Sequence, residues 1–283
     1  MQIQDEEVRV IAPRAGWRLL AWAFVEVWAY RDLVVFLVWR DVKVRYRQTI
    51  LGIAWVAMQP VANLVVLAFL FGRVLGVPSD GLPYPVFAFA GLVPWLFFSS
   101  TLTRCSASLV ASSHVLTKVY FPRVIVPISA VLSGLVDLAV SVPVLVMLAL
   151  WNGVHPGFAL LLIPVLVVWL AVVTLAPGLW LSALNVRYRD VAQALPVALQ
   201  VGMYLTPVVY PQRLLPSWAQ TAISFNPMTA TVEGFRWVLS GGAVPPTVAL
   251  VHSSLVSFPV VGVTLVTGLL YFLKTDRTFA DVV

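Results

Sequence analysis

The sequence predicts an all-α integral membrane protein in which six helices cross the bilayer, and two observations carry that prediction. Hydrophobic residues make up 60% of the 283 positions and charged residues only 11%, with a mean hydropathy of +0.94, whereas a soluble domain has about 25% charged residues. The apolar residues also gather in six segments of roughly 20 residues or more, the length that a spanning helix needs. The expected spans are residues 50–72, 84–105, 124–151, 158–184, 191–210 and 247–273.

Residues 1–49 are predicted to form a cytoplasmic N-terminus with an amphipathic helix that lies in the plane of the membrane. The apolar stretch 22–39 approaches the length of a span, but Glu26, Arg31 and Asp32 lie near its middle. Each of these charges costs about 2.5 to 3.5 kcal/mol at the bilayer centre. The tryptophans of this region suit the headgroup level instead, so we expect the helix to rest on the membrane.

A dense basic cluster follows directly before the first span. It comprises Trp39, Arg40, Lys43, Arg45 and Arg47. Four charges in eight residues suit a nucleic-acid patch, a membrane anchor or a docking surface for a partner. Beside a span, the cluster should face anionic lipid, with each charge contributing about 1 kcal/mol. Nucleic acid is therefore not an expected partner.

The distribution of basic residues orients the chain. Fifteen of the 18 Lys and Arg residues fall before residue 50, within 104–123 and 185–190, or after residue 273. The other three are Arg73, Arg213 and Arg236. Because short cytoplasmic loops are enriched in Lys and Arg, both termini are expected in the cytoplasm, with residues 274–283 as a tail and 106–123 as an inner loop.

The last outer loop, residues 211–246, is long and rich in leucine and aromatic residues. Non-helical backbone at membrane depth must be buried in protein or line a cavity, so we expect short re-entrant helices here, before the sixth span. The tripeptide Asn226-Pro227-Met228 should separate two helical pieces, with Pro227 at a turn or a first helical position. Glu233 and Arg236 are three residues apart and positioned to pair.

One acid, Asp137, falls within the predicted spans, with Ser133 and Ser141 on the same helix face. An ionisable group inside a membrane is a candidate proton relay. The alternative is a buried carboxylic acid that is hydrogen-bonded to a neighbouring helix. We favour this alternative, because no second acid, His, Lys or Arg is expected to accompany Asp137.

Uncharged polar side chains form two further stripes, one in the first span and one in the fifth. The first contains Gln59 and Asn63, and the second contains Gln193, Gln200 and Tyr204. Such stripes form interhelical hydrogen bonds or line a path for a hydroxyl-rich, uncharged substrate, and the sequence leaves both roles open.

Several kinds of chemistry are not expected. The three lysines follow Val42, Thr117 and Leu273, so the Gly-Lys-Ser/Thr ending of a phosphate-binding loop is missing, and energy must come from a partner, from an ion gradient or not at all. The three histidines lack Cys or carboxylate neighbours at ligand spacing, so no metal site is predicted. A single cysteine, Cys105, excludes an internal disulfide.

Five stretches, in register with the spans from about residue 31 to the C-terminus, resemble the membrane subunit of ABC-type polysaccharide exporters. These permeases move lipid-linked O-antigen, capsule or teichoic-acid chains across the bacterial inner membrane. The stretches are RDVKVRYRQTILGIAWVAMQP (40–60), FAGLVPWLFFSS (89–100), TKVYFPR (117–123), LSALNVRYRD (181–190) and NPMTATVEGFRW (226–237).

The resemblance implies a homodimer of permease subunits with two cytoplasmic ATPase subunits, which would bind the ATP and Mg²⁺. The substrate would be a glycan on undecaprenyl diphosphate, and this chain would hold no cofactor, metal or catalytic residue. The implied parts are an in-plane helix at 31–47, a coupling helix at 106–120 and re-entrant helices at 211–240. A stand-alone secondary carrier and a membrane enzyme are the rival classes, and an ordinary surface helix is the alternative at 106–123.

The resemblance also implies roles for individual residues. Contacts with the ATPase fall on Ser112, Ser113, His114, Lys118, Tyr120 and Arg123. The sugar pathway would be lined by Gln59, Asn63, Gln200 and Tyr204. A gate that grips the diphosphate headgroup would be formed by Trp39, Arg40, Lys43, Arg45 and Arg47.

Overall fold

The computed structural model describes residues 25, 27–47, 52, 54–113, 121–242 and 248–276. Every regular element in these residues is a helix, which confirms the all-α prediction. In chain order the elements are α2 (Arg31–Tyr46), α3 (Ala54–Leu67), η1 (Ala68–Val74), α4 (Tyr84–Ala111), α6 (Ile125–Trp151), η2 (Gly157–Leu162), α7 (Ile163–Arg187), α8 (Asp190–Leu205), η3 (Gln212–Leu214), α9 (Ser217–Ser224), α10 (Pro227–Leu239) and α11 (Val248–Asp276).

Within the described residues, five helical segments are long and apolar enough to cross a membrane. They are Ala54–Val74, Tyr84–Ala111, Ile125–Trp151, Gly157–Arg187 and Leu250–Thr275. The chain is therefore a multi-pass membrane protein. The predicted fifth span, 191–210, corresponds to α8, which has only 16 residues. At 1.5 Å per residue such a helix covers about 24 Å, less than the roughly 30 Å hydrocarbon core, so a count of six spans stays a prediction.

Helix α8 ends earlier than the sequence indicates, and a proline explains the difference. Thr206 has an extended backbone, with φ −94° and ψ 138°, and Pro207 follows it. A residue before proline is driven out of the helical region by the proline ring. Residues 206–210 were predicted to continue the helix because they are mostly apolar. In the structure they form irregular chain, in which Val208 and Val209 are buried.

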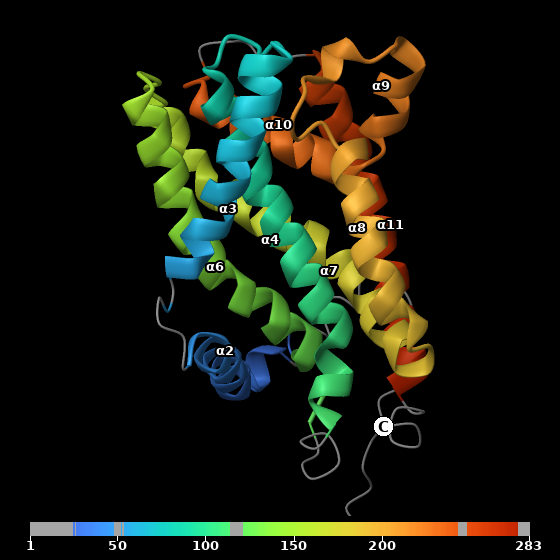
Figure 1. Ribbon diagram of the computed structural model, residues 1–283. Coiled ribbons are helices and arrows are strands. Elements are labelled where there is room, and N and C mark those ends of the chain that lie inside the picture. Colours follow the sequence, from blue (N-terminus) through green and yellow to red (C-terminus); the bar gives the residue numbers. More distant parts are fainter. Residues whose placement is uncertain are drawn as a thin grey trace, which may run out of the picture.

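Helix α4 is the centre of the bundle. Figure 1 shows it between α3 and α8, with α6 and α7 behind, and it packs directly against all four. Its apolar side chains fill the core; Phe87, Phe89, Trp95 and Phe97 are all buried. Because lipid tails are as apolar as these side chains, they stabilise the bundle through close van der Waals packing rather than through removal from water.

Helix α2 lies across one end of the bundle, below α3 and α6 (Figure 1), and this end is called the α2 end from here on. Val34 and Leu37 are buried and join a hydrophobic cluster with Phe121 and Ile125, while Trp39 on the other face is 59% exposed. One face of α2 thus packs on the bundle, but the opposite face exposes large apolar side chains such as Phe36 as well, so the amphipathic character stays a prediction. Its placement in the plane of a membrane stays a prediction.

The opposite end of the bundle is closed by residues 206–242, which are called the cap. Helices α9 and α10 are the two predicted helical pieces. Helix α10 starts with Pro227 at its first position, and the side chain of Asn226 accepts a hydrogen bond from the Met228 backbone N–H at 3.0 Å. The cap is part of the core, because α10 packs against α4, α7 and α11.

Arg236 holds the cap in place. Its side chain is buried, pairs with Glu233 at 2.8 Å as the spacing predicted, and lies 3.5 Å from the centre of the Phe87 ring. It also donates to the backbone oxygens of Val208 at 2.7 Å and Phe87 at 3.3 Å. The hydroxyl of Tyr84 donates to the next carbonyl, that of Val209, at 2.9 Å. These bonds give the irregular chain after α8 the partners that buried backbone requires.

Candidate functional site

A cleft of about 690 Å³ opens on the face of α4, between α3 on one side and α8 on the other. Its volume lies in the range of binding sites for small molecules. Helices α3 and α8 both pack on α4, and α6 and the end of α2 close the cleft at the α2 end. The lining residues that matter below are Arg45, Tyr46, Trp55, Gln59, Trp95, Phe97, Ser99, Ser100, Thr103, Arg104, Asp137, Ser141 and Gln200.

The two glutamines predicted as pathway residues line the same cleft from opposite walls. Gln59 comes from α3 and Gln200 from α8, although they are far apart in sequence. Trp55, Trp95 and Phe97 supply aromatic surface around them. Amides beside aromatic rings can hydrogen-bond and stack on a hydroxyl-rich ligand, so the wall has the chemistry that a sugar requires.

The other two predicted lining residues do not belong to this cleft. Asn63 and Tyr204 are exposed, and neither is part of its lining. Each is four residues from its glutamine on the same face of its helix, about one turn beyond the lining of the hollow. Their role in a pathway stays a prediction, as does that of Gln59 and Gln200.

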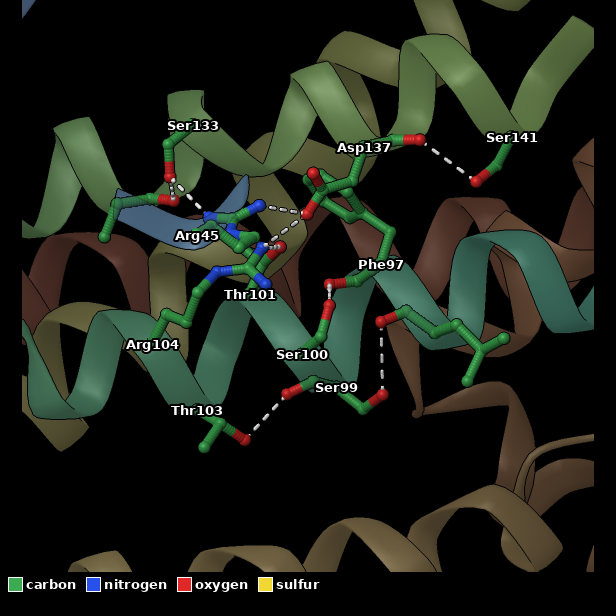
Figure 2. A network of polar contacts seen from close by, with 12 residues as sticks. Arg45, Phe97, Ser99, Ser100, Thr101, Thr103, Arg104, Ser133, Asp137 and Ser141 are labelled. Atoms are coloured by element: carbon green, nitrogen blue, oxygen red, sulfur yellow. Dashed lines mark hydrogen bonds and ion pairs between the residues drawn. The ribbon is translucent and has the colours of Figure 1, made fainter. Parts of the chain in front are cut away.

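A charged cluster occupies the α2 end of the cleft, and Asp137 is its centre (Figure 2). One carboxylate oxygen of Asp137 forms an ion pair with Arg45, and the other accepts a hydrogen bond from the hydroxyl of Tyr46. Nη2 of Arg104 lies 3.3 Å from the same carboxylate. The cluster therefore joins three elements, α2, α4 and α6, through one side chain.

Neighbouring hydroxyl groups hold the two arginines in place. Nη2 of Arg45 donates to Oγ of Ser133 at 3.3 Å, and Nη2 of Arg104 donates to Oγ1 of Thr101 at 2.9 Å. Helices α4 and α6 approach closely here because position 134 is a glycine. A Cβ at Gly134 would lie 3.0 Å from Nη2 of Arg104, so a larger residue would push the helices and the arginine apart.

The charges of this cluster do not balance among the described residues. Two guanidinium groups face one carboxylate, and Asp41, the next nearest acid, is paired with Arg40 at 2.9 Å. The exposed fractions of the Arg45, Asp137 and Arg104 side chains are 21%, 17% and 30%. The Nε–H of Arg104 is buried without a hydrogen-bond partner. Buried polar groups are nearly always paired, and this N–H is one of three buried side-chain polar atoms in the described residues that have no partner.

The expectation that no Lys or Arg accompanies Asp137 is wrong. The second span was predicted to end at residue 105, and Arg104 was counted with the inner loop. Helix α4 instead continues to Ala111, so Arg104 lies inside the helix. The first part of the predicted coupling segment, 106–111, likewise continues α4. A serine- and threonine-rich stretch, 99–103, precedes Arg104 and was the available signal that this helix has a polar face there.

Asp137 itself is hydrogen-bonded, in agreement with the favoured alternative. Its bonding partners, however, come chiefly from α2, which lies outside the spans, rather than from a neighbouring membrane helix. Burial and the hydrogen bond to Asp137 raise the pKa of Tyr46 above its usual value of 10.0. The Tyr46 hydroxyl is therefore neutral and able to donate at neutral pH.

The basic cluster of α2 divides between two faces of the helix. Arg45 points into the cleft, and Arg40 points toward the end of α4, where Nη2 lies 3.4 Å from Oγ of Ser112. Lys43 lies over the ring of Trp39 at 5.8 Å, and Arg47 is exposed. Lys43, Arg47 and Arg40 all line a shallow groove on α2. Of the four basic residues only Arg45 lines the cleft on α4, a distinction that the sequence did not reveal.

Half of the predicted ATPase contacts can be located. Ser112 is buried at the end of α4, and Ser113 and Arg123 are partly buried. His114, Lys118 and Tyr120 lie outside the described residues. The returning chain at Phe121 packs beneath α2, in the cluster of Val34 and Leu37. Both described ends of the segment 106–123 therefore contact α2.

In the described parts of the chain, no three His, Cys, Asp or Glu residues lie close enough together to hold a metal ion.

Comparison with known proteins identifies the family. The profile of the ABC-2 type transporter family matches residues 32–240, from α2 to the end of α10. "O-antigen export system permease protein RfbA" of Myxococcus xanthus is 31% identical over 82% of this chain and 90% of its own length. A Klebsiella pneumoniae protein of the same name is 27% identical over 89% and 95%.

"Polysialic acid transport protein KpsM" of Escherichia coli is 23% identical over 75% of this chain and 82% of its own length. The family profile matches most of the chain, and the chain covers most of the length of each of these relatives. Both findings agree with a bundle of membrane helices. The chain belongs to the ABC-2 type transporter family of membrane proteins.

Proposed function

We propose that the chain is the permease subunit of an ABC transporter that exports a lipid-linked, O-antigen-like polysaccharide across the bacterial inner membrane. The observation that carries the proposal is the cleft on α4, in which amides and aromatic rings lie beside a positively charged end. Relatives named as O-antigen export permeases support the substrate class, and the relative named for polysialic acid transport keeps capsule export as an alternative within the same family.

Energy would come from a partner subunit. The lysines of this chain lack a phosphate-binding loop, and family membership indicates an ABC ATPase as the partner. In the proposal, two copies of the ATPase bind ATP and Mg²⁺, and two copies of this chain form the path. Both termini face the cytoplasm, as the charge distribution predicts.

The α2 end is where the ATPase would act. The segment 106–123 leaves α4 beside α2, Arg40 contacts Ser112, and Phe121 returns beneath α2. A push on this segment would reach α2 through these contacts. Movement of α2 would in turn reach the cleft through Arg45 and Asp137. The cap contributes no such link in the described residues and serves as the fixed end.

The test joins an export measurement to a binding measurement. The chain and its ABC ATPase are produced in a strain that lacks its own O-antigen permease, and surface glycan is measured. We expect the two proteins to copurify and export to stop when the ATPase lysine that contacts the nucleotide is changed to alanine. Undiminished export with that inactive ATPase would overturn the proposal and favour a stand-alone carrier.

A further inference from the structure

Asp137 has two cationic partners that come from different parts of the molecule. Arg45 belongs to the last turn of α2, whereas Arg104 lies inside α4. Both pair with the same carboxylate oxygen, Oδ2, while Oδ1 accepts the hydrogen bond from Tyr46. One oxygen is therefore shared by a guanidinium group of the helix that lies across the end of the bundle and a guanidinium group of the bundle itself.

The two arginines are held by different contacts. Nη2 of Arg104 donates to Oγ1 of Thr101, on its own helix, at 2.9 Å and lies 3.3 Å from Oδ2 of Asp137. Arg45 forms the closer ion pair and also reaches Oγ of Ser133 at 3.3 Å. Figure 2 shows both guanidinium groups beside Asp137. If Arg45 withdraws, Arg104 is already in place to pair with the carboxylate.

This arrangement lowers the free energy that is needed to detach α2. In a buried pair of one arginine and one carboxylate, departure of the arginine leaves an uncompensated charge, which is strongly destabilising. Here, departure of Arg45 leaves Arg104 and Asp137 as a neutral pair within the bundle. While Arg45 is present, two like charges lie beside one oxygen and repel each other. Arg104 therefore weakens the attachment of α2 and also protects the bundle when α2 leaves.

We propose that Arg104 is a positioning residue, which acts through Asp137 to make the end of α2 detachable from the bundle. With α2 in place, Arg45 pairs with Asp137; with α2 displaced, Arg104 neutralises Asp137. Asp41, the next acid near Arg104, is paired with Arg40 at 2.9 Å and belongs to α2, so it moves together with that helix. The inference concerns the chain alone, and only the use of this motion in transport rests on the proposed function.

The experiment measures how often α2 lifts from the bundle in the full chain, purified in detergent. Val34, on the buried face of α2, is changed to cysteine, and its rate of reaction with the neutral reagent N-ethylmaleimide is measured. This thiol reacts only after α2 has lifted, when it is remote from Arg104 and Asp137, so the rate follows the fraction of detached helix. The native Cys105 is fully buried inside the bundle and reports on opening of the bundle itself.

The two single variants should act in opposite directions at position 34. Arg104→Gln should slow the reaction about threefold or more, because Arg45 then has sole use of Asp137 and meets no like charge. Arg45→Met should accelerate it at least about tenfold, because α2 loses a charge-assisted bond. Neither single change should accelerate labelling of Cys105. The double variant should accelerate that labelling at least about tenfold, because Asp137 then has neither arginine.

The matched control is Arg187→Gln. Arg187 is an exposed arginine at the end of α7 and lies outside the lining of the cleft, so the variant makes the same change in net charge at another place. It should leave both reaction rates unchanged. Arg104→Lys keeps the charge but loses the planar fork, so its rate at position 34 should lie between those of the parent chain and Arg104→Gln.

Four outcomes would overturn the proposal: an unchanged or faster reaction at position 34 in Arg104→Gln, no acceleration there in Arg45→Met, an equal slowing in Arg187→Gln, and labelling of Cys105 that a single variant accelerates as much as the double variant does. Failure of Arg104→Gln to fold would also count against it, since Arg45 alone should suffice for Asp137. Because no glycan and no ATPase take part, this result and the export measurement can fail independently.

Discussion

The two ends of the bundle each contain an arginine–carboxylate cluster, and they differ in how completely the charges are satisfied. At the cap, Arg236 faces one carboxylate and two backbone oxygens and packs on Phe87, with only 4% of the residue exposed. At the α2 end, Arg45 and Arg104 share Asp137, and a donor of Arg104 is left unused. The first cluster is closed and holds the fold together; the second lies in the wall of the cleft and has one carboxylate for two guanidinium groups.

The difference between the two clusters follows from the backbone around each arginine. Arg236 substitutes for missing backbone bonds where α8 stops before Pro207, so its donors are consumed by the chain itself. Arg104 lies within a continuous helix whose backbone needs no help. Its guanidinium group pairs instead with Asp137 on the neighbouring helix α6. The four predictions that follow test this difference from the largest expected effect to the smallest.

Loss of Arg236 should have the largest effect on stability. Arg236→Met leaves the carboxylate of Glu233 without its partner and two buried carbonyls without donors, and breaking a buried pair costs about 3–5 kcal/mol. The measurement is unfolding of the purified chain in detergent. The control is Arg213→Met, which breaks the exposed pair with Asp80 and should cost about 0–1 kcal/mol. Equal losses in the two variants would show that the buried Arg236 cluster stabilises the fold no more than an exposed ion pair does.

Insertion of two glycines should impair export when it is made at the α2 end of the bundle but not when it is made at the cap end. Placed after Ser113, where α4 passes into the segment 106–123, the insertion should abolish export or ATPase copurification, because force is transmitted only through packed elements. Placed after Asn152, in the turn between α6 and η2 at the cap end, the same insertion should retain most export. Unimpaired coupling in the first variant would return this segment to an ordinary surface element.

Arg→Lys substitutions should show how much each arginine of the basic cluster contributes to glycan export. Arg45→Lys should lower glycan export about three- to tenfold, because the fork that binds Asp137 or a phosphate is lost. Arg40→Lys should lower it less, and Arg47→Lys least, since Arg47 is exposed. Arg31→Lys, at the exposed start of α2, is the control. Wild-type export in all of the first three variants would leave the cluster as a lipid anchor.

The smallest effect concerns pH. The pKa of Tyr46 is raised in the folded chain by burial and by Asp137, so the bond from its hydroxyl contributes stability below pH 10 and loses it as the pH rises through the folded-state pKa. Tyr46→Phe should lower stability slightly at pH 8, and the difference from the parent chain should vanish at higher pH. Tyr188→Phe, an exposed tyrosine, is the control. A difference between the parent chain and Tyr46→Phe that grows above pH 10 would contradict this assignment.

The amino-acid sequence by itself determined the class of the protein and the rough place of nearly every helix. Apolar runs of about 20 residues have to cross or enter a membrane, and residues 124–151 illustrate this, since α6 covers almost the same range. Local chemistry also determined the start of α10 at Pro227 and the pair of Glu233 with Arg236, because both depend on neighbours within four positions along the chain.

Only the tertiary structure decided which distant residues meet. Arg45 and Asp137 are 92 positions apart, and nothing within either segment specifies the other. Arg104 looked like a loop residue because apolar content falls before the helix ends, and only the packing of α4 against α6 at Gly134 placed it beside Asp137. The packing of α3 and α8 on α4 put Gln59 and Gln200 in one cleft and left Asn63 outside it. Hydrophobic periodicity reports which side of a helix is apolar, but the partner of a polar side chain is set by how whole helices stack.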